Sequence, residues 1–156
     1  MKRVGALALI LVLSACATSS LERLKPGSMT LDRMRSTEKP TAEWKNSDGS
    51  VTLEYSNRPP SAHNVMLDFD GKGVLVNTRI VNTEDSIGLL KTGMTRAEVQ
   101  RIVGSPDRVL KDSQTGGDIW EIPTQFAVDD SPQRLIVIYW HPRVDGATRI
   151  VADQRF

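Results

Sequence analysis

The stretch from 93 to 106 predicts one short helix with both ends marked, in which the apolar Met94 before the cap and Val99 at the fourth helical position form a hydrophobic staple. Thr95 is a suitable N-cap, and Glu98, three residues later, can bond back to the cap, which makes a capping box. Gly104 can adopt the left-handed conformation that ends a helix, and Pro106 prevents its continuation. The full signature is Gly93, Met94, Thr95, Glu98, Val99, Gly104 and Pro106. A helix of about eight residues does not persist alone, so we expect it to pack on another element.

A weaker copy of this pattern lies earlier in the chain and predicts a tandem duplication. Gly27 and Met29-Thr30 match Gly93 and Met94-Thr95, and residues 31–36 form the expected first helix. Further on, the strand that starts at Val65 aligns with the one that starts at Leu135. The tetrapeptide Thr-Arg-Ile-Val recurs with the same separation, at 78–81 and 148–151. The matches are collinear, which favours duplication over chance.

Apolar runs between turn residues predict four strands in each copy. The expected strands of the first copy are 44–45, 51–55, 65–69 and 74–81, and those of the second are 109–110, 118–122, 134–140 and 147–152. The predicted fold class is α+β, with two tandem modules at 20–83 and 84–156. Each is expected to be a short helical unit packed on a small antiparallel sheet, in two layers.

The period-two pattern of the strands predicts which residues face each core. In the first copy the core face is Val65, Leu67 and Phe69. The matched alignment then assigns Leu135, Val137 and Tyr139 to the core of the second copy. The residues left facing outward, with Trp120 on the core side, are Ile119, Ile136, Ile138 and Trp140.

Four outward apolar residues suggest either of two roles. They can pack between the copies or beneath the loop at 123–132, where Phe126 could act as a lid. They can also form a binding surface for a periplasmic or envelope partner. Loss of stability in Ile138→Asp would favour the first role, and loss of a partner with intact folding would favour the second.

The N-terminus predicts export and a lipid anchor. Lys2 and Arg3 precede an apolar run at 4–13, which is too short for an ordinary transmembrane helix. The sequence Leu13-Ser14-Ala15-Cys16 resembles a bacterial lipobox, so 1–15 is the expected signal peptide and 16–19 a tether. In such lipoproteins the cysteine carries a covalent lipid, including palmitate, and Ala17 after it suggests sorting to the outer membrane. The alternative is ordinary cleavage nearby that leaves Cys16, the only cysteine, as a free thiol.

Composition and motifs point away from nucleic acid, metals and catalysis. The 20 Lys and Arg residues balance 19 Asp and Glu residues, unlike the basic composition of a nucleic-acid binder. His63 and His141 are the only histidines, and neither has metal ligands at a useful spacing. Arg79 and Arg149, at matched places in the repeated tetrapeptide, are expected to be charged outward residues. We therefore predict no enzyme activity, no metal and no cofactor except the lipid on Cys16.

The helix signature from Gly93 to Pro106, followed by Trp120 and an apolar strand, resembles the SmpA/OmlA (BamE-like) family of small lipoproteins. The resemblance implies a helical unit on a small antiparallel sheet, anchored in the inner leaflet of a Gram-negative outer membrane and facing the periplasm. It also implies a protein-binding accessory of the β-barrel assembly machinery, or a role with another envelope protein. The chain differs from the family in carrying the module twice and in having Asp107-Arg108-Val109 in place of Asp-Pro-Phe.

A second resemblance keeps another function open. Tandem helix-plus-sheet modules are also similar to the β-lactamase inhibitory proteins, which implies a periplasmic protein inhibitor or sensor that binds its partner through a sheet. A small envelope hydrolase is the third alternative, for which no nucleophile motif is present.

Overall fold

The structure is a computed structural model that describes residues 21–56, 63–124 and 134–154. The predicted signal peptide at 1–15, Cys16, the tether and the Phe126 loop lie outside the described residues. Within these three segments, no helix is long and apolar enough to cross a membrane.

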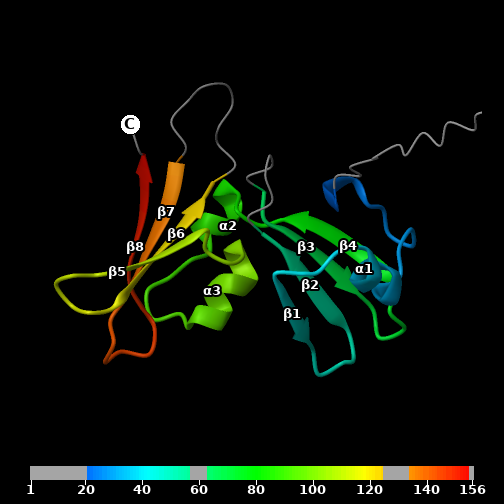
Figure 1. Ribbon diagram of the computed structural model, residues 1–156, viewed down its shortest axis with the longest axis horizontal. Coiled ribbons are helices and arrows are strands. Elements are labelled where there is room, and N and C mark those ends of the chain that lie inside the picture. Colours follow the sequence, from blue (N-terminus) through cyan, green and yellow to red (C-terminus); the bar gives the residue numbers. More distant parts are fainter. Residues whose placement is uncertain (1–20, 57–62, 125–133, 155–156) are drawn as a thin grey trace, which may run out of the picture.

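Two four-stranded antiparallel sheets and a few short helices make an α+β fold (Figure 1). The first half contains η1 (Leu21–Arg23), α1 (Leu31–Thr37), β1 (Ala42–Lys45), β2 (Val51–Tyr55), β3 (Val65–Phe69) and β4 (Leu75–Ile80). The second half contains α2 (Glu84–Gly88), α3 (Arg96–Val103), β5 (Arg108–Lys111), β6 (Asp118–Pro123), β7 (Arg134–Trp140) and β8 (Ala147–Gln154). All eight expected strands are present, and in each sheet they pair in sequence order. The helices η1 and α2 were not predicted.

The helices and sheets alternate along the long axis of the molecule (Figure 1). Met34 of α1 belongs to a core cluster with Leu53 and Leu67 of the first sheet. Val99 and Val103 of α3 belong to the core cluster of the second sheet. In Figure 1, α2 and α3 lie between the two sheets, and α1 lies beyond the first sheet. The order of layers is therefore second sheet, α2 with α3, first sheet, α1.

The two sheets share details of register. In each sheet the last strand has one extra residue where it pairs with the third strand: Val76 lies opposite the step from Asp68 to Phe69, and Thr148 lies opposite the step from Tyr139 to Trp140, so each makes a β-bulge. The last strand of each sheet begins with backbone bonds to the segment before the helix. Gly27 N–H donates to the Leu75 carbonyl, and Gly93 N–H donates to the Ala147 carbonyl, both at 2.8 Å.

The predicted ends of α3 are confirmed. Thr95 is its N-cap, and the Thr95 backbone N–H donates to Glu98 Oε2 at 2.7 Å, which completes the capping box. Gly104 is the C-cap at φ +84°. The helix is amphipathic, with Val99 and Val103 fully buried. Local chemistry is therefore sufficient to define this helix.

The capping box should make stability depend on pH. The backbone N–H and hydroxyl of Thr95 hold the pKa of Glu98 below its ordinary value. A carboxyl with a depressed folded pKa contributes stability above its unfolded pKa, and loses that contribution as the pH falls through the folded pKa. Glu98→Gln should therefore be less stable than the parent at pH 7, and the difference should vanish in acid below the folded pKa.

Urea unfolding of both proteins across this pH range measures the difference. Asp145→Asn, in the exposed turn after β7, controls for the loss of any surface carboxylate. A gap between parent and Glu98→Gln that persists at the lowest pH would contradict the assignment.

Candidate functional site

The predicted partner surface on the second sheet is wrong in three of its four residues. Ile136 and Ile138 are 0 % exposed and Trp140 is 4 % exposed. All three belong to the core cluster that contains Val99 of α3. Ile119 alone lies on the outer face as predicted, and it is partly exposed.

The error is a one-residue slip in the comparison of the two copies. Leu67 lies opposite Leu53 in the first sheet, and Ile138 lies opposite Trp120 in the second. Because Trp120 takes the place of Leu53, Ile138 corresponds to Leu67, whereas the sequence alignment had matched Leu67 with Val137. Side chains alternate between faces along a strand, so one residue of slip exchanges the inner and outer faces.

The repeated Thr-Arg-Ile-Val segments are also not equivalent in the structure. Arg79 lies opposite Met66, whereas Arg149 lies opposite Tyr139. Arg149 stacks over the Tyr139 ring at 5.2 Å, and Arg79 binds Asp68 instead. Both arginines lie on outer faces, as predicted, but at different positions.

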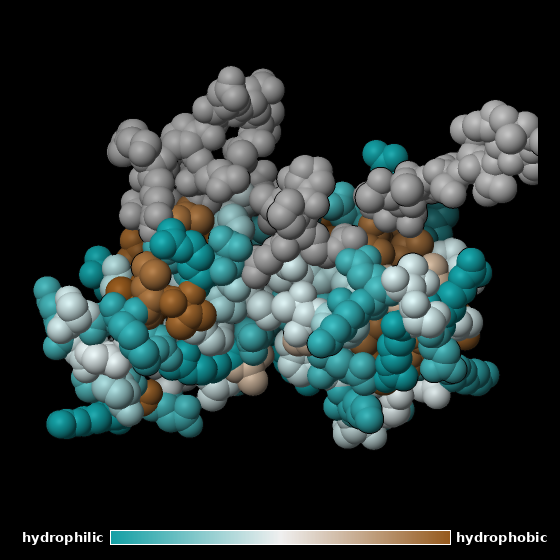
Figure 2. All heavy atoms as spheres, in the orientation of Figure 1, coloured by the Kyte–Doolittle hydropathy of each residue, from teal (hydrophilic) through white to brown (hydrophobic). Residues whose placement is uncertain are grey.

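The outer face of the second sheet is mostly apolar. Its central residues are Ile119, Glu121, Leu135, Val137 and Tyr139. Ile119, Leu135 and Tyr139 are partly exposed. At the edge of this sheet, hydrophobic atoms gather where β5 runs (Figure 2). The helices of the described segments pack elsewhere: η1 and α1 against the first sheet, α2 and α3 against the opposite face of the second. This outer face is the candidate binding surface.

The outer face of the first sheet holds the end of α3. Asn64 Nδ2 donates to the carbonyls of Val103 and Ser105, at 2.9 and 3.3 Å. Glu54 accepts the backbone N–H of Ser105 and the hydroxyl of Ser56. Glu54 and Asn64 are both fully buried. A carboxylate acceptor and an amide donor therefore bind the helix end and the turn that follows it.

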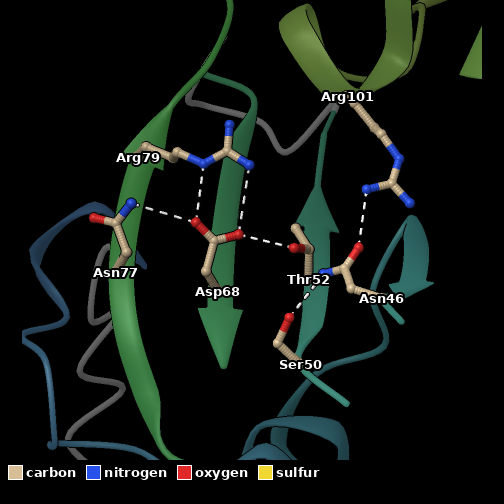
Figure 3. A network of polar contacts seen from close by, with 7 residues as sticks. All are labelled: Asn46, Ser50, Thr52, Asp68, Asn77, Arg79 and Arg101. Carbon is tan, nitrogen blue, oxygen red and sulfur yellow. Dashed lines mark hydrogen bonds and ion pairs between the residues drawn. The ribbon is translucent and has the colours of Figure 1, made fainter. Parts of the chain in front are cut away.

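Polar side chains cover the rest of that face. Thr52, Asn77 and Arg79 all point toward Asp68, and Arg79 Nε lies 3.0 Å from its carboxylate (Figure 3). From α3, Arg101 reaches Asn46 at 3.1 Å. Asp68 and Arg79 therefore neutralise each other on this face, and the bond from Arg101 to Asn46 adds a second contact between α3 and the first half of the chain.

On the inner side of the second sheet, Arg96 joins α3 to the tryptophans. Its guanidinium lies 5.2 Å from the Trp120 ring centre and 4.6 Å from that of Trp140. Asp118 accepts from Lys111 at 2.5 Å and from Arg96 at 2.9 Å. These bonds, that of Lys111 above all, hold the pKa of Asp118 below its ordinary value. The contacts of Arg96 therefore hold α3 against the second sheet at the edge of the core.

Glu121 occupies the same register position as Glu54. Glu54 lies opposite Met66, and Glu121 lies opposite Val137, each one residue after the paired positions Leu53 and Trp120. Glu121 is 3 % exposed, and Arg108 Nη1 lies 3.4 Å from its Oε2. Both sheets therefore carry a buried carboxylate on the outer face.

The histidines form no metal centre in the described part of the chain. His63 Nδ1 lies 2.8 Å from Glu22 Oε1, and His141 Nδ1 accepts the Arg143 N–H in the turn after β7. Residues 21–56, 63–124 and 134–154 hold no group of three or more His, Cys, Asp or Glu that could bind a metal ion.

Sequence reasoning missed Glu54 and Asn64. Glu54 lies between Leu53 and Tyr55 in a strand that is buried on both faces, and a charged residue in such a strand indicates a buried partner. Its partner could not be read locally, because Ser105 lies far along the chain.

No family model, curated protein or solved structure was found to match this chain.

Proposed function

We propose that this protein is a lipoprotein of a Gram-negative outer membrane, held by the lipid on Cys16, that acts by binding another envelope protein. The lipobox at 13–16 supports the anchor, and only Ala17, Thr18 and Ser19 separate Cys16 from the start of the first half. At ~3.5 Å per residue this tether reaches about 10 Å, which keeps the folded part next to the membrane.

The proposal includes two tandem modules, each a helix on a four-stranded sheet. The matching bulges, the matching bonds from Gly27 and Gly93, and the two threonine N-caps support duplication. In stacked repeats each unit packs only against its neighbours.

The observation that carries a binding role is the apolar outer face of the second sheet. The corresponding face of the first sheet holds a helix end, whereas no helix of the described segments covers the partly exposed Ile119 and Tyr139. Apolar surface of this kind is typical of interaction sites. The resemblance to the SmpA/OmlA family suggests the barrel-assembly machinery or envelope integrity as the setting.

Two variants and a crosslinking experiment test the proposal. Cys16→Ser should lose the lipid mass and leave the membrane fraction. Ala17→Asp is the matched control, which should keep the lipid mass and change only the membrane that holds the protein. An unchanged mature mass in Cys16→Ser would contradict the lipoprotein assignment.

Crosslinking in intact cells, followed by purification of the parent protein, identifies the partner class. Recovery of barrel-assembly subunits is the expected result. A single soluble periplasmic protein would instead favour the inhibitor or sensor function, and the absence of any stoichiometric envelope partner would contradict a binding role.

A further inference from the structure

The last strand of the second sheet, β8, is an unprotected edge. The described residues form this sheet in the order β5 to β8, so β5 and β8 are its two edges. An edge strand presents backbone N–H and carbonyl groups that can pair with a further strand, and natural edges are commonly short or carry lysine or proline. β5 has four residues and includes Lys111, whereas β8 has eight residues with neither lysine nor proline. A further strand would therefore pair at β8.

The matching edge of the first sheet, β4, is tied to the segment that precedes it. The bulges place Leu75 of β4 and Ala147 of β8 at equivalent positions. Three residues after Leu75, the hydroxyl of Thr78 donates to the Leu24 carbonyl at 3.0 Å, just beyond η1. The equivalent residue of β8 is Ile150, which has no hydroxyl to donate. The edge of β8 therefore lacks the bond that holds the η1 segment on β4.

The direction of the backbone groups along β8 follows from the comparison with β4. In the first sheet, Val81 N–H donates to the Asn64 carbonyl and so points toward β3. The equivalent residue of β8 is Asp153. Because backbone groups alternate in direction along a strand, those of Asp153 and of the residues two and four positions before it point toward β7. The N–H and carbonyl groups of Ile150 and Ala152 therefore point to the free edge.

We propose that β8 pairs with β8 of a second copy of this chain, antiparallel and about a two-fold axis at Val151. In this register Ile150 of each copy exchanges backbone hydrogen bonds with Ala152 of the other. Arg149 of each copy then lies opposite Asp153 of the other, so opposite charges meet twice. An axis one residue earlier or later would bring Val151 opposite one of these charged residues and would lose both pairs. Charge complementarity thus selects the second copy and its register.

The residues nearest the axis are accessible. Arg149 lies opposite Tyr139 and Val151 lies opposite Val137, both on the outer face of the sheet. Arg149 is exposed and Val151 is partly exposed. Pairing would join two four-stranded sheets into one continuous antiparallel sheet. The inference goes beyond the proposed function, because self-association requires neither the lipid nor the envelope partner.

Disulfide crosslinking at the axis tests the proposal in intact cells. Val151→Cys places two cysteines opposite each other in a non-hydrogen-bonded pair, where the Cα atoms lie about 4.5 Å apart, within reach of a disulfide. Mild oxidation should give a covalent dimer on a non-reducing gel. Thr148→Cys is the matched control, because Thr148 is exposed on the same strand but would lie about 20 Å from its copy. This variant should stay monomeric.

Reversal of the charges gives a second test. In the Val151→Cys protein, Arg149→Asp should raise the dissociation constant of the reduced dimer about tenfold, because each ion pair becomes a pair of like charges. Sedimentation in detergent measures this constant. Addition of Asp153→Arg should restore the dimer, since the reversed charges are again complementary. Both variants lose the contact of Arg149 with the Tyr139 ring, so that loss cannot explain the restoration.

Three results would overturn the inference: no dimer from Val151→Cys, equal crosslinking of Val151→Cys and Thr148→Cys, or no restoration by the double charge reversal. A disulfide from Val151→Cys to a different envelope protein would also overturn it and would assign the edge to that protein. All dimers are scored against the parent, whose only cysteine is Cys16. A covalent dimer of the parent would contradict the lipid anchor, whereas the absence of a dimer from Val151→Cys would contradict only the pairing of β8.

Discussion

Gly104→Ala is expected to destabilise the protein by about 4 kcal/mol, the sum of backbone strain and overpacking. Gly104 has φ +84° and ψ −178°, a conformation that only glycine adopts readily. A Cβ there would lie 2.7 Å from Asn64 Nδ2 and 2.9 Å from Asn64 Cβ. Asn64 is buried and bonded to the end of α3, so it cannot move away without breaking those bonds. Urea unfolding followed by tryptophan fluorescence measures the loss.

Gly93→Ala is the matched control for the backbone contribution. Gly93 has a similar φ of +88°, but nothing lies within 4 Å of the position that its Cβ would take. Its replacement should cost about 1 kcal/mol, the strain of a positive φ alone. Equal losses in the two variants would show that the contact between Gly104 and Asn64 is not a tight one.

Ile138→Asp is expected to cost about 5 kcal/mol or to prevent folding, because it places an unpaired charge in a closed core. Ile138 is 0 % exposed and packs with Val99, Trp120 and Trp140. Far-UV and near-UV circular dichroism of the purified variant, with urea unfolding where it folds, measures the effect.

Ile119→Asp is the control on the opposite face of the same sheet. Ile119 is partly exposed and lies one residue before the buried Trp120. Its replacement should change the free energy of unfolding by about 1 kcal/mol or less. If Ile138→Asp folded normally and Ile119→Asp did not, the inner and outer faces of the second sheet would have to be exchanged.

The elements that depend on neighbouring residues could be predicted from the sequence. The ends of α3 are defined by Thr95, Glu98 and Gly104, all within one stretch, and the structure has the helix between them. The strands were predicted because the apolar runs are separated by turn residues such as Asn46 to Gly49. The core face of the first sheet was also correct, since Val65, Leu67 and Phe69 alternate with polar or less apolar positions.

The faces of the second sheet could not be predicted in the same way. From Leu135 to Trp140 every residue is apolar or aromatic, so the pattern along β7 does not distinguish inside from outside. The assignment then depended on the alignment of the copies, which a one-residue difference between the halves had displaced. Only the pairing of Trp120 with Ile138 fixes which face is which, and that pairing is a long-range property.

The candidate site depends even more on distant contacts. Glu54 and Ser105 meet because α3 lies between the sheets, and nothing near Glu54 in the sequence indicates this. The same is true of Asn64 and the Val103 carbonyl. Sequence patterns predicted that one face would bind something, but the choice of face required the register.

The position of α3 between the sheets also affects the order in which parts of the chain can fold. Synthesis proceeds from the N-terminus, so β1 to β4 are complete before α3 has emerged. Until then Glu54 and Asn64, which are fully buried in the finished protein, lack the bonds that they make to the end of α3. The second half of the chain therefore protects the first half during folding, because it covers a surface of the first sheet that could otherwise bind other proteins.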